Sequence, residues 1–452
     1  MEDISRRSFV RRVTGAGVGA SAFTIIKPEL VRGAGKEKLK FGLVGCGGRG
    51  TAAVLNNFTG CENTELVAMG DVFRDRLESS FKRLKGNEKF ADRVSVTPDR
   101  QFVGFDAYKK VIDSGADVVI LATSPAYRPL HFEACIDAKK HVFCEKPFGT
   151  DPVGVRRCMA AAKRSEQMKL TVVSGAQRRF ARDYQETVKK IQGGAIGDIT
   201  SAYAYWIGTP VIQQKARDPK WSEMEWQNRA WYSFVWICGD QVVEQHLHNI
   251  DVCNWVMGTH PASVVASGGA AWRPREEIYG NIYDHIVADF VYPNGAHMLS
   301  HCRQYPREGG IYGNVSELVV GTKGRSNCHD LGGGSGQDPR TAFKDPLEDP
   351  YVREHIALCD SIRGNGPFLN HAQEVAESTM TCVMARESAY SGLEITWEDM
   401  MASKLDLQPE YAWDAKPVVT PLPVPGVYKF ERVKKEQAPA ERPARKAGKK
   451  AG

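Results

Sequence analysis

The sequence lacks a run of apolar residues long enough to cross a membrane. Its weakly apolar stretch near the start, residues 13–26, holds about 14 residues rich in Gly and Ala, whereas a spanning helix needs roughly 20. No longer apolar stretch follows it. The sequence therefore predicts no integral membrane segment.

Paired cysteine spacing is also missing. The chain has 11 cysteines, an odd number, and none of them form a C-x-x-C motif. This argues against a regular disulfide framework and against a structural zinc site. We interpret Cys46 and Cys144, which border the two strongest motifs described below, as small buried packing residues.

Excess charge of one sign is confined to the chain ends. The formal net charge is +6, yet residues 427–452 alone hold nine Lys or Arg against three Glu, and residues 1–35 hold six against three acidic residues. The body between them is slightly acidic, so we expect no nucleic-acid surface. The tail, rich in Lys, Ala, Pro and Glu, is predicted to be disordered.

Two arginines near the N-terminus stand in the pattern S-R-R-S-F at residues 5–9, followed by the short apolar stretch. This arrangement is typical of a twin-arginine export signal, which carries folded proteins out of the cytoplasm. We expect residues 1–35 to be a signal segment and the protein to be periplasmic. An uncleaved membrane anchor is the alternative.

A glycine-rich loop, GCGGRG at residues 45–50, lies between a strand pattern at 40–44 and a helix pattern at 51–58. Its G-x-G-x-x-G spacing lets the backbone turn tightly and approach a pyrophosphate at a helix N-terminus. An ordinary Gly-rich turn is the alternative. The predicted cofactor-binding residues of the loop are Gly45, Gly47, Gly48, Arg49 and Gly50.

The choice of cofactor depends on Asp71. It follows a second strand pattern at 65–69 and lies about 20 residues past the loop, where a carboxylate binds the ribose hydroxyls of NAD. The same carboxylate repels a 2′-phosphate. Arg74 and Arg76 follow closely and would attract one. We therefore predict NAD and leave NADP open.

Strand and helix patterns alternate from residue 38 to about 148, as a doubly wound α/β domain requires. The apolar strand at 117–123 ends in Ser124-Pro125, and the strand at 141–144 ends in Glu145-Lys146-Pro147. Open α/β sheets bind ligands beyond the carboxyl ends of their strands. The residues that map to this edge are Thr123, Pro125, Glu145 and Lys146.

The region after residue 148 begins with a helix pattern at 152–168 and a strand pattern at 170–173, and then becomes antiparallel in character. We expect a large open sheet packed on the first domain, with its other face free for contacts in a homo-oligomer. The predicted units are a signal segment (1–35), an NAD-binding Rossmann domain (36–148), a substrate and oligomerisation α+β domain (149–405), a C-terminal extension (406–426) and a basic tail (427–452).

Three segments together resemble the Gfo/Idh/MocA oxidoreductases: GCGGRG, LATSPAYRPLHFEACIDAKKHVFCEKP and GDQVVEQHLHNIDVCNW. The resemblance extends from about residue 38 to 404. It implies a Rossmann domain followed by an α/β domain whose sheet covers the active site. It also implies that Thr123 and Pro125 line the nicotinamide side, that Glu145 and Lys146 lie beneath nicotinamide and substrate with Lys146 catalytic, and that Pro147 follows through a cis bond.

The third segment departs from the usual pattern. Relatives carry an Asp four residues before a catalytic His, whereas this chain has Glu244 before His248. A spacing of four places both on one helix face. On that wheel Asp251 lies beside them, which makes it a candidate substrate-binding residue, and His246 points to the opposite side.

Oxidation of a sugar hydroxyl needs a base for the hydroxyl proton while the hydride leaves carbon. His248 fits the base because its ordinary pKa lies near working pH. Lys146 would hydrogen-bond the same oxygen, and Glu244 would orient or compensate the pair.

Further substrate-facing candidates are Arg179, which follows a strand end, and Trp231, from an aromatic-rich stretch whose rings can stack on sugars. We predict no metal, because His246 and His248 lie two apart and a regular helix separates them by about 200°. If the backbone between His246 and His248 is not a regular helix, a metal site becomes possible again.

The sequence thus predicts an exported NAD-dependent oxidoreductase that acts on a sugar, polyol or glycoside with tightly bound cofactor. Two alternatives remain open. One is a glycoside hydrolase or lyase that oxidises its substrate transiently, and the other is a metal-dependent or non-catalytic carbohydrate-binding protein on the same fold.

Overall fold

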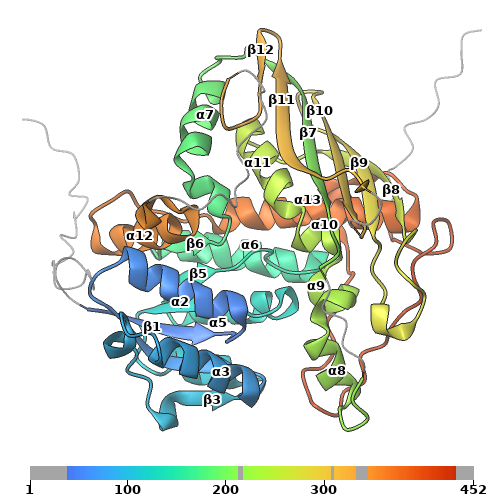
Figure 1. The fold of residues 1–452 in the computed structure, drawn as a ribbon. Coiled ribbons are helices and arrows are strands. Elements are labelled where there is room, and N and C mark those ends of the chain that lie inside the picture. Colours follow the sequence, from blue (N-terminus) through green and yellow to red (C-terminus); the bar gives the residue numbers. More distant parts are fainter. Residues whose placement is uncertain (1–37, 212–216, 307–309, 332–344, 434–452) are drawn as a thin grey trace, which may run out of the picture.

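The computed structural model describes residues 38–211, 217–306, 310–331 and 345–433 (Figure 1). The predicted twin-arginine segment and most of the basic tail lie outside these ranges. Among the described residues, no helix combines the length and apolar character that a bilayer crossing requires.

The first domain is built on a six-stranded parallel sheet in the order β3-β2-β1-β4-β5-β6. The strands are β1 (Leu39–Val44), β2 (Thr64–Asp71), β3 (Gln101–Val103), β4 (Val118–Leu121), β5 (His141–Cys144) and β6 (Val172–Ser174). The sequence VVIL of β4 is buried throughout, because helices cover both faces of the sheet. The helices of this domain are α2 (Gly48–Gly60), α3 (Arg74–Lys85), α4 (Ala107–Ile112), α5 (Arg128–Asp137) and α6 (Pro152–Gln167).

The division predicted at residue 148 leaves out part of this sheet. Strand β6 pairs with β5 and is the last strand of the first sheet, reached through α6 as the crossover helix. Helix α12 (Pro350–Arg363) also returns to the first domain, where it packs against α2. Nothing local in a three-residue apolar strand indicates which of two sheets it joins.

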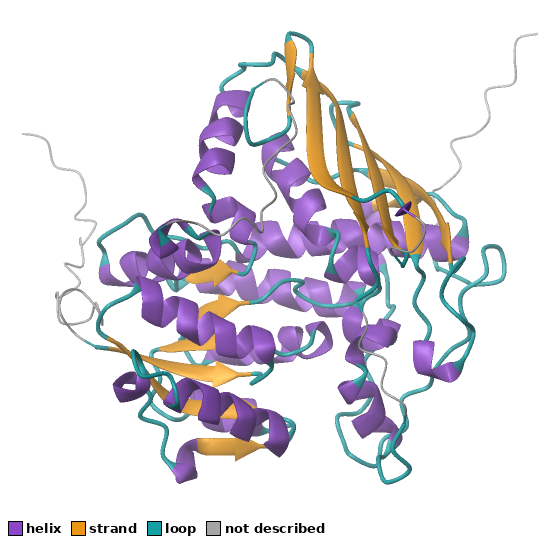
Figure 2. Cartoon of the chain, in the orientation of Figure 1, coloured by secondary structure: helices purple, strands orange, loops and turns teal. Residues whose placement is uncertain are grey.

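The second domain holds a seven-stranded sheet in the order β12-β11-β7-β10-β9-β8-β13, which is separate from the first sheet (Figure 2). Its strands are β7 (Ile199–Gly208), β8 (Ser263–Gly269), β9 (His285–Val291), β10 (His297–Gln304), β11 (Asn314–Gly321), β12 (Gly324–Ser326) and β13 (Ile395–Thr396). The pair β7/β10 is parallel and the other pairs are antiparallel. The predicted fold class, a Rossmann domain with a mostly antiparallel second sheet, is confirmed.

Helix α13 (Ala372–Ser391) joins the two domains. It packs on α6 of the first domain and on β8 of the second, and it is buried continuously from Ser378 onward. Its fully buried Arg386 pairs with Glu387 and donates hydrogen bonds to the carbonyls of Thr150 and Gly239. The other helices of this domain are α7 (Arg182–Gln192), α8 (Glu223–Arg229), α9 (Val235–Cys238), α10 (Gln241–Glu244), α11 (Leu247–Met257) and α14 (Trp397–Ala402).

One face of the second sheet is covered by α11 and α13, and the other carries exposed apolar side chains such as Val265 and Leu299. Subunit contacts through this outer face stay a prediction. All 11 cysteines are buried and unpaired, including Cys46 and Cys144.

Candidate active site

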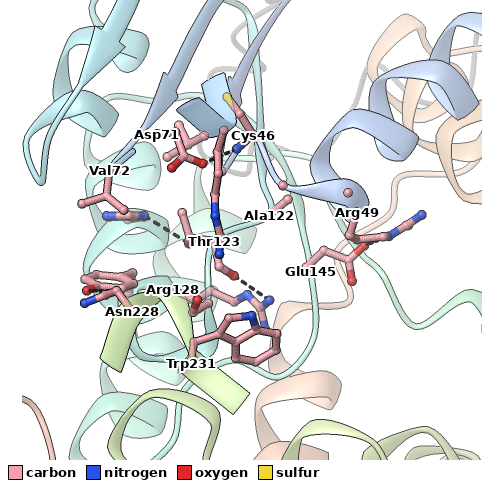
Figure 3. Close-up of a pocket in the computed structure, with 18 of the residues that line it drawn as sticks. Cys46, Arg49, Asp71, Val72, Ala122, Thr123, Arg128, Glu145, Asn228 and Trp231 are labelled. Atoms are coloured by element: carbon pink, nitrogen blue, oxygen red, sulfur yellow. Dashed lines mark hydrogen bonds and ion pairs between the residues drawn. The ribbon is translucent and has the colours of Figure 1, made fainter. Parts of the chain in front are cut away.

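A cavity of about 800 Å³ lies between the carboxyl ends of the first sheet and the second domain (Figure 3). Both domains contribute to its walls. The predicted site residues that line it are Gly45, Gly47, Gly48, Arg49, Asp71, Thr123, Glu145, Lys146, Trp231, Glu244 and His248. The structure therefore brings the three sequence motifs to one place.

The glycine loop leaves room for a pyrophosphate. A Cβ added to Gly47 or Gly48 would meet no atom within 4 Å, and both residues stand at the start of the 13-residue helix α2. Gly45 has φ of +95°, and a Cβ there would lie 2.5 Å from the carbonyl carbon of Ala122. Free backbone amides at a helix N-terminus, with no side chains above them, fit a dinucleotide.

Gly50 has a different place from the one predicted. It does not line the cavity, and an added Cβ would lie 1.9 Å from the carbonyl oxygen of Gly45. Its missing side chain lets α2 pack closely on the loop. Pro125 is likewise buried in the turn η5 (Pro125–Tyr127), and its neighbours Ser124 and Tyr127 face the cavity instead.

Asp71 supports the loop and faces the cavity. Its carboxylate accepts hydrogen bonds from the backbone N–H of Cys46 at 2.6 Å and of Phe73 at 2.8 Å (Figure 3). Burial raises the pKa of Asp71, and these hydrogen bonds oppose the rise. A carboxylate fixed beside the loop fits the ribose of NAD. Arg76 also lines the cavity, whereas Arg74 does not.

Arg49 is held by two carboxylates. It forms ion pairs with Glu145 and, at 2.7 Å, with Glu354 of α12, and its guanidinium lies 4.7 Å from the ring centre of Tyr351. Glu354 is fully buried, and burial raises its pKa although Arg49 opposes the rise. Sequence reasoning missed Glu354 and Tyr351, because their helix follows strands β7 to β12 of the second sheet in the chain.

Lys146 pairs with Glu244 across the domain boundary. Its Nζ lies 3.0 Å from Oε1 of Glu244 and also donates to the main-chain carbonyl of that residue. The peptide bond between Lys146 and Pro147 is cis, which confirms the expectation from the resemblance.

The continuous helix predicted across Glu244 and His248 is wrong. Helix α10 ends at Glu244 and α11 begins at Leu247. In an unbroken α-helix the carbonyl of Glu244 would accept from the N–H of His248. Here that N–H donates to Gln245 at 3.4 Å, and Lys146 takes the freed carbonyl. The break therefore creates the second contact of Lys146.

His248 is buried and faces the cavity. Burial lowers its pKa well below the ordinary 6.5, and the charges of Lys146, Arg178 and Arg49 lower it further. The imidazole is therefore neutral at physiological pH and able to accept a proton.

The structure corrects the predicted substrate roles of Arg179 and Asp251. Neither lines this cavity, and they bind each other through two hydrogen bonds of 2.8 Å. Asp251 also accepts from the hydroxyl of Ser378 at 2.8 Å. These buried contacts hold α11 and α13 to the turn η6 (Gln177–Phe180) and leave neither charge free for a ligand.

His246 lies away from the cavity, with Nε2 2.7 Å from the hydroxyl of Ser300. Within the part of the chain that the structure describes, no group of three or more His, Cys, Asp or Glu side chains is arranged to hold a metal ion.

Several cavity residues were not predicted. Asn228 and Arg229 of α8 reach over from the second domain, where Asn228 accepts a hydrogen bond from Tyr127 at 2.7 Å. After β6 the cavity is lined by Gly175 and Gln177 instead of Arg179. The aromatic-rich stretch around Trp231 was the only local sequence feature that indicated this side of the cavity.

Comparisons with known proteins agree with this geometry. Residues 39–174 match the family model described as an oxidoreductase family with an NAD-binding Rossmann fold. The myo-inositol 2-dehydrogenase of Thermotoga maritima is 24% identical over 289 residues, which cover 64% of this chain and 74% of that protein. The 2,7-anhydro-N-acetylneuraminate hydratase of Escherichia coli is 29% identical over 40% of this chain and 43% of its own length.

A solved structure shares the fold. The WlbA dehydrogenase from Bordetella pertussis, in complex with NADH and UDP-GlcNAcA, superposes with a TM-score of 0.60 at 19% identity, covering 80% of this chain and 98% of that one.

The glycine loop yields the first testable prediction. Gly50→Ala forces a Cβ onto a backbone oxygen and should destabilise the fold by about 1–3 kcal/mol. Gly47→Ala meets no atom and should change stability by less than about 0.5 kcal/mol. It should instead weaken NAD binding about tenfold or more, because its methyl occupies the pyrophosphate space. Urea unfolding and calorimetric NAD titration measure the two effects. Equal stability losses in both variants would contradict the assignment.

Proposed function

We propose that this chain, an NAD-binding oxidoreductase with the Rossmann domain of the Gfo/Idh/MocA family, oxidises a hydroxyl of a sugar, polyol or glycoside. One observation carries the proposal. Lys146 of the first domain and His248 of the second line the same cavity onto which the glycine loop opens. The inositol and sugar-nucleotide names of the similar proteins support the substrate class.

The residues of the site divide the chemistry as follows. Bound NAD would supply the acceptor for the hydride that leaves the substrate carbon. His248, neutral because of its lowered pKa, takes the hydroxyl proton. Lys146 has three N–H donors, two of which bind Glu244, so the third is free for the substrate oxygen as negative charge develops on it. Glu244 balances the lysine charge.

A redox-neutral reaction is the second candidate. Oxidation at one carbon acidifies the neighbouring C–H; a base removes that proton, the glycosidic group leaves, water adds, and the hydride returns to the first carbon. The relative that is named as a hydratase favours this route. Such a cycle consumes no cofactor, which suits an enzyme located away from the cytoplasmic NAD pool.

Turnover assays with a panel of sugars, polyols and glycosides, with and without added NAD, test the proposal. Net oxidation gives NADH in proportion to product, and the redox-neutral route releases product without NADH. Lys146→Ala should lower turnover by about 10²–10⁴-fold while NAD still binds. Lys163→Ala, an exposed lysine on α6, serves as the matched control. Wild-type turnover in Lys146→Ala would remove this lysine from the mechanism.

Carbohydrate binding without any turnover would favour the non-catalytic alternative.

The position of His248 predicts a pH dependence. Since its folded pKa is lowered, the base stays neutral as pH falls, and kcat/KM should decline only well below pH 6.5. Lys146→Gln removes a positive charge and should raise the pKa of His248 in an NMR titration. His371, whose pKa of about 4 is set by burial and by Arg179, should not move. An unchanged His248 titration in the variant would show that Lys146 does not act on it.

Export is a proposal that rests on the twin-arginine pattern at residues 5–9 and on the short apolar stretch that follows it. Residues 1–35 fused to a folded fluorescent reporter should direct it to the periplasm of a bacterium with the twin-arginine route. The double substitution Arg6→Lys and Arg7→Lys should keep the reporter in the cytoplasm. Cell fractionation measures both, and cytoplasmic retention of the unaltered fusion would refute the proposal.

A further inference from the structure

The chain does not end on the second sheet but crosses back over both domains. After α14 the segment 406–417, which we name the strap, passes the first domain and then runs beside α8 (Figure 1). Its Gln408 donates hydrogen bonds to Thr150 at 2.9 Å and to Asp151 at 2.8 Å. Farther along, the carbonyl of Pro417 accepts from Gln227 of α8 at 2.8 Å.

Two aromatic residues of the strap contact the wall of the cavity. The ring of Trp413 lies 4.8 Å from that of Phe105 and 5.7 Å from that of Phe73. The ring of Tyr411 lies 4.7 Å from that of Tyr127, and its hydroxyl donates to the carbonyl of Ala126 at 3.2 Å. Phe73, Phe105 and Tyr127 all line the cavity. The strap is thus the outer layer of that wall.

The part of this wall that Trp413 contacts belongs to the adenine end of the site. Phe73 follows Asp71 at the end of β2, and Phe105 follows β3, on the side of the sheet opposite to Lys146. In a doubly wound sheet the pyrophosphate lies on the glycine loop and the adenosine half extends past the carboxylate that binds its ribose. Trp413 therefore lies at the adenine end, whereas Tyr411 contacts the turn η5 that follows β4.

The second domain closes the same wall from the other side. Arg229 lies 4.1 Å from the ring centre of Phe73 and forms an ion pair with Asp75 at 3.1 Å. Residues of η5, α8 and the strap pack in one apolar cluster that spans the domains. Because the strap is bonded to both domains, the cleft cannot widen at this end without breaking these contacts.

We propose that the strap completes the adenine end of the dinucleotide site and keeps the cofactor bound from one turnover to the next. A ligand behind a closed wall leaves only when the wall opens, so the free energy of opening adds to the barrier for dissociation. The inference rests on the assigned NAD site and goes beyond the proposed reaction. It implies that the hydride is returned within the same complex, either to the carbon that it left or to the carbonyl carbon of a second sugar.

Exchange of bound cofactor tests the strap. The full-length protein, loaded with NAD, is mixed with an excess of isotopically labelled NAD, and exchange is followed by mass spectrometry. Trp413→Ala and Tyr411→Ala should each exchange at least ten times faster than wild type. Trp413→Phe retains an aromatic ring against Phe105 and should restore slow exchange. Val418→Ala, at an 80% exposed position directly after the strap, is the matched control and should exchange like wild type.

Exchange in wild type as fast as in Trp413→Ala would overturn the proposal, and so would unchanged exchange in both alanine variants. Thermal unfolding of each variant separates a local opening of the wall from a general loss of stability. Faster exchange with an unchanged melting temperature supports the proposed role of the strap. Cofactor exchange measured in Lys146→Ala distinguishes the proposed reaction from the proposed role of the strap. If no tested carbohydrate is oxidised yet exchange still depends on Trp413, the proposed reaction fails and the strap stands.

Discussion

The site depends on the buried ion pair between Lys146 and Glu244. The two side chains come from different domains and are each about 10% exposed. Leaving one of them unpaired in such surroundings costs roughly 3–5 kcal/mol. Packing of the second domain on the first and assembly of the catalytic groups are therefore one event, because each domain buries a charge that only the other neutralises.

Charges around the cavity follow the same rule of pairing. Arg49 is neutralised by Glu145 and Glu354, and Arg178 by Glu317, so the cations near His248 are fixed and compensated. Burial and, to a smaller extent, the charges of Lys146, Arg178 and Arg49 still lower the pKa of His248 and keep the imidazole neutral. A neutral imidazole can accept the hydroxyl proton, and the lysine that pairs with Glu244 can donate a hydrogen bond to the developing alkoxide.

Local sequence patterns were sufficient for strands β1, β2, β4 and β5, the glycine loop, Asp71 and the residues after β5, because each depends on its neighbours in the chain. Periodicity failed at residues 244–248, where the helix breaks and Lys146, which is distant in sequence, takes the carbonyl of Glu244. The predicted substrate roles of Arg179, from its place after a strand, and of Asp251, from the helical wheel, also failed, because the two charges bind each other. Glu354, Asn228 and Trp413 reach the site or its wall only through tertiary packing, which one sequence does not encode in any local motif.

The burial of every cysteine bears on where such a protein can work. A thiol reacts with oxidants as its thiolate, and burial raises the pKa of Cys46, Cys144 and Cys382 among others. With no thiol at the surface, the folded chain presents nothing for a disulfide oxidase or for glutathione to act on. It can therefore keep one covalent structure in a reducing or an oxidising compartment.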